Sequence, residues 1–227
     1  MRAPISIVIP SLNAAAALPA CLAALVEGLQ AGLIREVIVS DGGSTDNTRA
    51  LAEGWGAEVI LGAPSRGGQL RRGCGAARGD WLLVLHADTV LAPGWTDAAQ
   101  NHMANRGGAA GWFRLRFDQR GLVPRLVAGW ANLRSGLGLP YGDQGLLLPR
   151  ALYEEVGGYP DQPLMEDVAL ARALRGRLHR LEGLAITSAE KYRRQGWLRR
   201  GGRNLWTLGR YAMGASPDDL AQSYRRS

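Results

Sequence analysis

Two carboxylates stand out because each follows a short apolar run of the kind that forms a buried strand. Asp41 follows residues 36–40, and Asp88 ends a segment that begins with the run 81–85. Mg²⁺ and Mn²⁺ prefer oxygen ligands, and Mg²⁺ usually takes one or two carboxylates together with the phosphates of a substrate. This arrangement favours chemistry on a phosphorylated ligand that a divalent metal ion accompanies.

Asp88 is the candidate for the metal ion because His86 stands two residues before it. Side chains two residues apart in a strand point to the same side, so the imidazole and the carboxylate are predicted to face one ion. Asp88 is therefore a candidate metal ligand and, through the ion, a candidate nucleotide-binding residue, and His86 is the second candidate metal ligand. The alternative is that Asp88 only caps the turn that leads toward Pro93.

Asp41 is followed by Gly42 and Gly43, which allow the backbone to approach a ligand closely. A carboxylate at this position is a candidate acceptor of hydrogen bonds from a base or a ribose. The same segment would also form a tight turn before a helix capped by Asp46 or Asn47. The local sequence leaves both interpretations open.

A second acidic group, Glu166-Asp167, stands at the start of the predicted helix 165–175. The helix dipole favours carboxylates at this end whatever their role. As a functional residue, Asp167 is a candidate general base that removes a proton from an acceptor hydroxyl. Arg66 is a candidate partner for a phosphate or a base, with a solvated surface arginine as the alternative.

The segment Tyr141-Gly142-Asp143-Gln144 is polar, contains a glycine and precedes a short apolar run. We interpret these four residues as candidate lining of an acceptor pocket, to which Glu166 is also assigned. A plain turn is the alternative.

These residues must be positioned by the elements around them, and the first half of the chain alternates strand-like and helix-like segments. The predicted strands are 5–9, 36–40, 58–61 and 81–85, and the predicted helices are 14–30, 46–53 and 69–77. The alternation predicts an α/β fold with a mostly parallel, doubly wound sheet and helices on both faces. Ligands of such sheets bind beyond the carboxyl ends of the strands, so Pro10, Ser11 and Leu12 are expected beside Asp41 and Asp88.

The composition fits one folded domain with an anionic partner. The chain has 227 residues, 46% of them hydrophobic, and a net charge of +7, which suits nucleotide phosphates, a membrane surface or nucleic acid. The two cysteines form no Cys-x-x-Cys pair, and no P-loop, dinucleotide-binding glycine fingerprint or nucleophile elbow occurs. We recognise no secretory signal and no run long enough to span a bilayer, and therefore expect a cytoplasmic protein.

Several short motifs occur together and in order. They are Ile5-Ser6-Ile7-Val8-Ile9-Pro10-Ser11-Leu12-Asn13, Val39-Ser40-Asp41-Gly42-Gly43-Ser44-Thr45-Asp46, Leu85-His86-Ala87-Asp88-Thr89, Gly157-Gly158-Tyr159-Pro160 and Met165-Glu166-Asp167. In this combination the chain resembles family 2 glycosyltransferases, the inverting enzymes with the GT-A fold, over nearly its whole length. The tail resembles that of a compact, stand-alone bacterial subset.

The resemblance implies a Rossmann-like, mostly parallel sheet with a smaller acceptor-side region. It implies one domain, 1–227, made of a nucleotide-sugar-binding half (1–92), an acceptor half (93–186) and a basic helical tail (187–227). The family's polysaccharide synthases also carry a Gln-x-x-Arg-Trp motif and membrane helices, which this sequence lacks. The expected reaction is therefore non-processive, inverting transfer of one sugar from a nucleotide-sugar, usually a UDP-sugar, to an acceptor hydroxyl.

The resemblance also assigns roles to residues. By this comparison Pro10, Ser11, Leu12 and Asp41 hold the nucleotide, and Arg66 approaches its base or phosphate. Asp88 matches the second acid of the Asp-x-Asp motif that binds Mg²⁺ or Mn²⁺, and Asp167 matches the general base. His86 departs from the family, in which many members carry Asp at that position.

Two other functions are compatible with parts of the sequence. A sugar nucleotidyltransferase also uses an α/β fold, carboxylates and Mg²⁺, but would need a glycine-rich basic loop after the first strand. A non-catalytic basic module that binds a membrane or nucleic acid is the second alternative. Arginines interleave with Trp197, Trp206 and Tyr211 in the tail, which suits peripheral membrane contact or a lipid-linked acceptor. Nothing else in the chain suggests nucleic acid.

Overall fold

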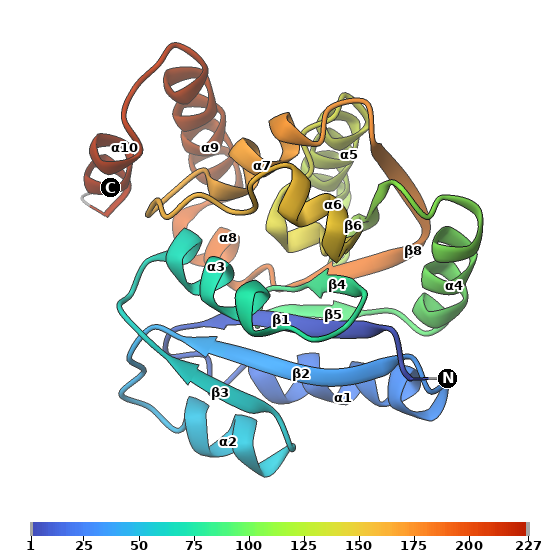
Figure 1. The fold of residues 1–227 in the computed structure, drawn as a ribbon. Coiled ribbons are helices and arrows are strands. Elements are labelled where there is room, and N and C mark those ends of the chain that lie inside the picture. The colour runs from blue at the N-terminus through green and yellow to red at the C-terminus, as the bar shows by residue number, and fades with distance from the viewer. Residues whose placement is uncertain (1, 226–227) are drawn as a thin grey trace.

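The computed structural model describes residues 2–225 and shows one eight-stranded sheet with helices packed around it (Figure 1). The strands are β1 (Ile5–Ser11), β2 (Ile34–Asp41), β3 (Glu58–Leu61), β4 (Trp81–Val84), β5 (Thr89–Leu91), β6 (Ala110–Phe117), β7 (Leu146–Pro149) and β8 (Leu178–Thr187). The α-helices are α1 (Leu18–Gln30), α2 (Thr48–Gly54), α3 (Arg66–Ala76), α4 (Trp95–Asn105), α5 (Leu122–Gly136), α6 (Arg150–Glu155), α7 (Glu166–Ala173), α8 (Glu190–Gln195), α9 (Trp197–Ala212) and α10 (Pro217–Arg225). A short 3-10 helix, η1, spans Gly142–Gln144.

The strand order is β3-β2-β1-β4-β7-β6-β8-β5. Strands β1 to β4 pair in parallel, which confirms the predicted doubly wound first half. The second half mixes directions: β7 runs antiparallel to both β4 and β6, and β5 runs antiparallel to β8, whereas β6 and β8 are parallel. One continuous sheet therefore joins the two halves of the chain.

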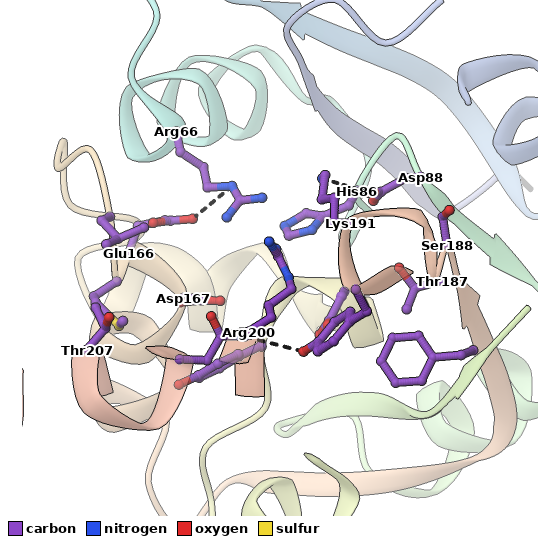
Figure 2. A pocket seen from close by; sticks show the side chains of 17 residues that line it. Arg66, His86, Asp88, Glu166, Asp167, Thr187, Ser188, Lys191, Arg200 and Thr207 are labelled. Carbon is purple, nitrogen blue, oxygen red and sulfur yellow. Dashed lines mark hydrogen bonds and ion pairs between the residues drawn. The ribbon is translucent and has the colours of Figure 1, made fainter. Parts of the chain in front are cut away.

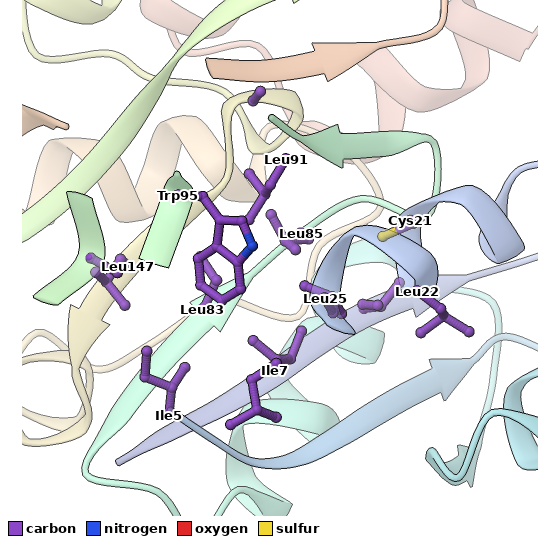
Figure 3. Packing of buried hydrophobic residues seen from close by; sticks show 14 of the residues in the cluster. Ile5, Ile7, Cys21, Leu22, Leu25, Leu83, Leu85, Leu91, Trp95 and Leu147 are labelled. Atoms are coloured by element: carbon purple, nitrogen blue, oxygen red, sulfur yellow. The ribbon is translucent and has the colours of Figure 1, made fainter. Parts of the chain in front are cut away.

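Both faces of the sheet are covered because successive residues of the buried strands pack on opposite sides. Ile5, Ile7 and Ile9 of β1 belong to a core shared with α1, α2 and α4, while Val8 belongs to a second core shared with α3, α6 and α7. Trp95 fills the centre of the first core, where it is fully buried and its indole N–H donates to the carbonyl of α1 residue 24 at 3.1 Å (Figure 3). These two cores fix the strand ends that carry the polar residues.

Several boundaries differ from the predictions for local reasons. Helix α1 begins at Leu18 rather than residue 14, because the amides of residues 14 and 15 donate to the side chains of Thr48 and Asp46. Helix α3 begins three residues before the predicted start, because Ser65 caps it by accepting from the amide of residue 68. Arg66 is thereby the first residue of a helix.

The tail folds back onto the domain as helices. Tyr192 of α8 and Trp197 of α9 stack with ring centroids 4.8 Å apart, and both rings pack against Phe117 at the end of β6. Helix α9 also contacts α5 and α10. Within residues 2–225, no helix combines the length and the apolar character needed to cross a bilayer.

Candidate active site

Two hollows meet beyond the carboxyl ends of β1 and β4, as expected for this type of sheet. The larger one, here the large cleft, has a volume of about 480 Å³, within the range of small-ligand sites. The smaller one, here the small pocket, has a volume of about 130 Å³.

The large cleft is bordered by the β1–α1 loop, the start of α3 and the β4–β5 turn. Its lining residues are Pro10, Ser11, Leu12, Asn13, Ala14, Ala16, Ala17, Pro64, Ser65, Arg66, Gln69, His86, Ala87, Asp88, Pro163, Ser188, Glu190 and Lys191. Five of the six residues predicted to hold the nucleotide thus border one cleft: Pro10, Ser11, Leu12, Arg66 and Asp88. Gln69, which the sequence did not single out, ties β1 to β2 by donating to the carbonyls of Ser11 and residue 40 at 2.7 and 3.0 Å.

Asp41 ends β2 at the edge of the sheet, as predicted, but its carboxylate is turned into the protein. It is fully buried and does not line the large cleft. Its carboxylate accepts hydrogen bonds from the hydroxyls of Ser11 and Ser44 and from the amides of Gly43 and Ser44. Burial alone would raise the pKa of Asp41, but these hydrogen bonds outweigh burial and lower it.

These four hydrogen bonds give Asp41 a structural role, because they shape the turn after β2. That Asp41 also binds the nucleotide stays a prediction. This turn also holds the β1–α1 loop, which forms one wall of the cleft. The backbone amide of Asn13 in that loop donates to the hydroxyl of Ser44, and its side-chain oxygen accepts from the amide of Thr45, both at 2.8 Å.

The large cleft and the small pocket share five lining residues, Arg66, His86, Asp88, Ser188 and Lys191. Figure 2 shows the small pocket with Arg66 and Glu166 on one side and the pair Lys191–Asp88 on another. A ligand that extends from the cleft into the pocket must pass these five residues. We call this shared region the junction. It presents two cations, Arg66 and Lys191, and one carboxylate, Asp88, which suits a diphosphate with or without a metal ion.

Asp88 is engaged by a residue that the sequence did not connect to it. The ammonium group of Lys191, the only lysine of the chain, lies 3.0 Å from Oδ2 of Asp88. Burial would raise the pKa of Asp88, but the interactions with the basic groups around it, Lys191 first, together outweigh burial and lower it. Asp88 is therefore ionised at neutral pH and available to any cation that displaces Lys191.

The strand alternation that was predicted to place His86 and Asp88 on one side does not apply to them. Strand β4 ends at Val84, so both residues lie in the turn before β5, where side chains do not alternate as in a strand. Nε2 of His86 is buried without a hydrogen-bond partner and packs directly against Gly142, where a β-carbon would collide with the ring. Burial and the charge of Arg66 lower the pKa of His86 to about 3, so the imidazole is neutral.

The metal ion that the sequence implies can be tested against these donors. Among residues 2–225 no group of three or more His, Cys, Asp or Glu side chains is arranged to hold a metal. Asp88 is a single ionised carboxylate at the junction, while Nε2 of His86 is covered. The donor set fits an ion that arrives together with a diphosphate and is completed by its oxygens, rather than one held by the protein alone.

The small pocket gathers the second set of acids. Asp143, Glu166 and Asp167 line it together with Tyr141. Its remaining lining residues are Arg66, His86, Asp88, Phe117, Leu164, Met165, Thr187, Ser188, Lys191, Tyr192, Arg200, Asn204 and Thr207. Residues 141–144 and 166–167, which are distant in sequence, thus converge on one space.

Glu166 is almost completely buried, with 1% of its side chain exposed. It forms a salt bridge with Arg66, whose Nε lies 3.5 Å from Oε1. Burial, and then the charge of Asp167, raise the pKa of Glu166 to about 7 against the opposing effect of Arg66. Burial likewise raises the pKa of Asp143 to about 6.

The Glu166→Gln variant should change how stability depends on pH. In the wild type the folded state keeps a proton on Glu166 between its ordinary pKa of 4.5 and about 7, whereas the unfolded chain releases it. The contribution of this group is therefore complete below pH 4.5 and is lost as the pH rises toward 7. Relative to the wild type, the variant should gain on the order of 3 kcal/mol in free energy of unfolding across that window.

Denaturant unfolding at a series of pH values measures this difference. The contribution of Asp143 to the pH dependence cancels, because both proteins contain this residue. The matched control is Glu53→Gln, which removes an exposed carboxylate outside the pocket. If both variants shift the pH profile equally, the effect does not belong to Glu166.

Two backbone amides hold the carboxylate of Asp167 in the first turn of α7. Its Oδ2 accepts from the amide of Gly142 at 3.1 Å, and its Oδ1 accepts from the amide of Val168 at 2.8 Å. The preceding Met165 has a φ of +65°, a left-handed conformation that a non-glycine residue rarely adopts and that clusters at functional sites. The carboxylate is thus fixed in orientation while it borders the small pocket.

The four residues predicted to line the acceptor pocket divide into two groups. Tyr141 and Asp143 border the small pocket, whereas Gly142 and Gln144 do not. Gln144 is fully buried, and its amide bonds to Ser135, to the carbonyl of residue 113 and to neighbouring groups. Gly142 donates its amide to Asp167 and borders a further, smaller hollow with Tyr141 and Asp167, while Gln144 anchors η1. That Gly142 and Gln144 contact the acceptor stays a prediction.

The far wall of the small pocket comes from the tail. Lys191, Tyr192, Arg200, Asn204 and Thr207 all line it, and sequence reasoning assigned none of them to the site. The available signal was the basic and aromatic composition of this segment, which pointed to a membrane or nucleic acid instead. Figure 2 shows Arg200 reaching into the same space as Arg66 and His86.

The sequence model of the family described as "Glycosyl transferase family 2" matches residues 6–145. Proteins named "PGL/p-HBAD biosynthesis glycosyltransferase" from Mycobacterium bovis (strain BCG / Pasteur 1173P2) and Mycobacterium tuberculosis (strain ATCC 25177 / H37Ra) are each 39% identical over 99 residues. The match covers 40% of this chain and 38% of each relative, so it spans less than half of their length.

Two solved structures share the fold. Glucosyl-3-phosphoglycerate synthase from Mycobacterium tuberculosis, crystallised with Mn²⁺, UDP and phosphoglyceric acid, superposes with a TM-score of 0.57 at 23% identity over 82% of this chain and 69% of that chain. TarS of S. aureus, crystallised with UDP-GlcNAc, gives 0.61 at 13% identity over 82% of this chain and 58% of that chain. At these identities the likeness shows the architecture alone.

Proposed function

This chain belongs to glycosyl transferase family 2 and is a glycosyltransferase with the GT-A architecture, and from that premise we propose that it transfers a sugar from a UDP-sugar to an acceptor hydroxyl with inversion. The observation that carries the proposal is the junction at Arg66, Asp88 and Lys191. It joins a cleft large enough for a nucleotide to a smaller pocket bordered by Asp167.

The large cleft receives the nucleoside in this proposal. Its wall is the β1–α1 loop with Pro10, Ser11 and Leu12, held in place by the Asp41 turn. Uridine is proposed because the two solved structures described above contain UDP or UDP-GlcNAc. The diphosphate then lies at the junction, where Arg66 and Lys191 offset its charge.

A divalent ion bound with the diphosphate, with Asp88 as its protein ligand, would supply positive charge to the leaving group. The mycobacterial synthase structure with Mn²⁺ and UDP supports this use of metal. Lys191 contacts Asp88 at 3.0 Å in the structure, so donor binding requires it to move from the carboxylate toward a phosphate oxygen. His86, neutral and packed on Gly142, forms part of the wall instead of binding the ion.

In the proposed reaction the acceptor oxygen attacks the anomeric carbon as the bond from that carbon to the diphosphate oxygen breaks. The electron pair of the broken bond stays on the diphosphate, and the hydroxyl proton passes to Asp167. The amides of Gly142 and Val168 orient the Asp167 carboxylate for this transfer. Tyr141, Asp143 and the tail residues bound the space left for the acceptor, and one displacement inverts the anomeric configuration.

A thermal-shift panel of UDP-, GDP- and dTDP-sugars, each with and without Mn²⁺ or Mg²⁺, tests the donor proposal. A ligand that binds only the folded state raises the melting temperature, by an amount that corresponds to about 2.7 kcal/mol at a hundredfold excess over Kd. We expect a rise with UDP-sugars that is larger when metal is present. A rise with another nucleotide instead, or an equal rise with all three, contradicts the assignment of uridine.

A further inference from the structure

Helix α5 exposes an unusual run of apolar side chains to solvent. Leu122, Leu126, Trp130, Leu133 and Leu137 recur at intervals of three or four residues, which places them on one side of the helix. Leu122 and Leu137 are each 77% exposed, and Trp130 is 50% exposed. We call these five residues the α5 stripe.

The opposite side of α5 already has its partner. Pro124, Ala128, Ala131 and Ser135 are buried, and the alanines pack against Phe117 and its neighbours on β6. The α5 stripe therefore is not needed to hold the helix on the domain. Large contiguous apolar surfaces of this kind mark interaction sites in soluble domains.

Helix α9 lies beside α5 and adds further exposed apolar side chains. Leu198 is 88% exposed, Met213 just beyond the helix is 77% exposed, and Trp206 is 66% exposed. The two helices contact each other and lie at the end of the molecule remote from β2 and β3 (Figure 1).

The segments that contain α5 and α9 carry positive charge only. Residues 119–142 and 191–217 together contain ten basic residues and no acidic one, which exceeds the net charge of +7 of the whole chain. Arg120, Arg125 and Arg194 are among the exposed members. Exposed Leu and Trp side chains combined with arginines are typical of surfaces that lie in the interface of an anionic membrane.

We propose that the α5 stripe and the exposed apolar residues of α9 dock this protein onto an anionic phospholipid surface. Resting on the proposed function, this docking brings the small pocket, which α8 and α9 help to line, to a lipid-linked acceptor hydroxyl. The charge argues against a second copy as the occupant, because a twofold contact would place the same arginines opposite one another. The positive charge of these two segments is instead complementary to phosphate headgroups.

Sedimentation of the full chain with vesicles of phosphatidylcholine alone, or of phosphatidylcholine mixed with phosphatidylglycerol, tests the proposal. We expect binding to the mixed vesicles that weakens with salt, and little binding to phosphatidylcholine alone. Trp130→Ser should weaken binding to the mixed vesicles about tenfold or more, because it removes a large apolar group from the membrane. Arg125→Gln should weaken it about fivefold.

The matched control is Trp55→Ser. Trp55 is 46% exposed, close to the 50% of Trp130, but it follows α2 in the other half of the chain. Its substitution should leave vesicle binding unchanged. Equal losses in both variants, or no binding of the wild type to anionic vesicles, overturn the proposal.

Analytical ultracentrifugation without vesicles tests whether a second copy of the chain occupies the α5 stripe instead. A wild-type dimer that Trp130→Ser dissociates would assign the α5 stripe to a second copy and overturn membrane docking. A thermal shift with UDP on the same preparations separates the two proposals: a protein that binds UDP but no vesicle keeps its proposed function and loses this inference.

Discussion

Asp167→Asn should leave the affinity for UDP nearly unchanged while kcat falls by about 10²–10⁴-fold, the usual contribution of a general base. The substitution keeps the shape of the side chain, and the amide oxygen can still accept from the amide of Gly142 at the same position. What it removes is the capacity to take a proton from the acceptor hydroxyl. Steady-state kinetics with the identified donor, combined with UDP titration, measure both quantities.

The matched control is Asp97→Asn. Asp97 also stands in the first turn of a helix, but it is exposed on α4 and borders neither hollow. This variant should keep wild-type turnover and UDP affinity. Near-normal turnover in Asp167→Asn would remove Asp167 from the reaction, and a parallel loss of UDP binding would show that the substitution disturbs the site as a whole.

Glu166 is the competing candidate for the base, and its environment decides against it. Its pKa of about 7 would suit proton transfer near neutrality. However, its side chain is 1% exposed and lies against Arg66, so an acceptor hydroxyl has little access to it. Both acids line the small pocket, but Asp167 is only partly buried and is oriented by two amides. Glu166→Gln should therefore reduce turnover much less than Asp167→Asn.

The sequence predicted the parts of the fold that depend on local patterns. The apolar runs that became β1 to β4 are continuous and are each followed by polar or glycine-bearing loops, so both their existence and their parallel arrangement could be inferred. The direction of β7 could not be inferred, because a four-residue run carries no information about the strands beside it. The sequence also indicated which loops meet at the sheet edge.

The sequence could not show how each side chain in those loops is used. Asp41 and Gln144 are polar residues in the expected places, yet their hydrogen-bonding capacity is spent inside the protein. Whether a carboxylate faces a ligand or its own backbone depends on χ angles and neighbours that a motif does not encode. The pairing of Lys191 with Asp88 joins residues 103 positions apart, and only the fold brings them together.

Asp88→Ala should remove the dependence of donor binding on metal. In Mn²⁺ the affinity for UDP should fall about 100-fold, because an ion at the diphosphate contributes several kcal/mol and Asp88 is its proposed protein ligand. Without metal, wild type and variant should bind UDP with similar, weak affinity. Isothermal titration with UDP, in Mn²⁺ and in chelator, measures all four affinities.

Lys191→Gln is the control that makes this result interpretable. Both substitutions break the contact between Lys191 and Asp88, but only Asp88→Ala removes a metal ligand. Lys191→Gln should therefore keep the difference between Mn²⁺ and chelator, and bind UDP somewhat more weakly in both because a cation at the junction is lost. If Asp88→Ala also keeps that difference, the ion is held without Asp88. If both variants lose it, the intact pair matters rather than the carboxylate alone, since the two side chains would then act as one unit at the diphosphate.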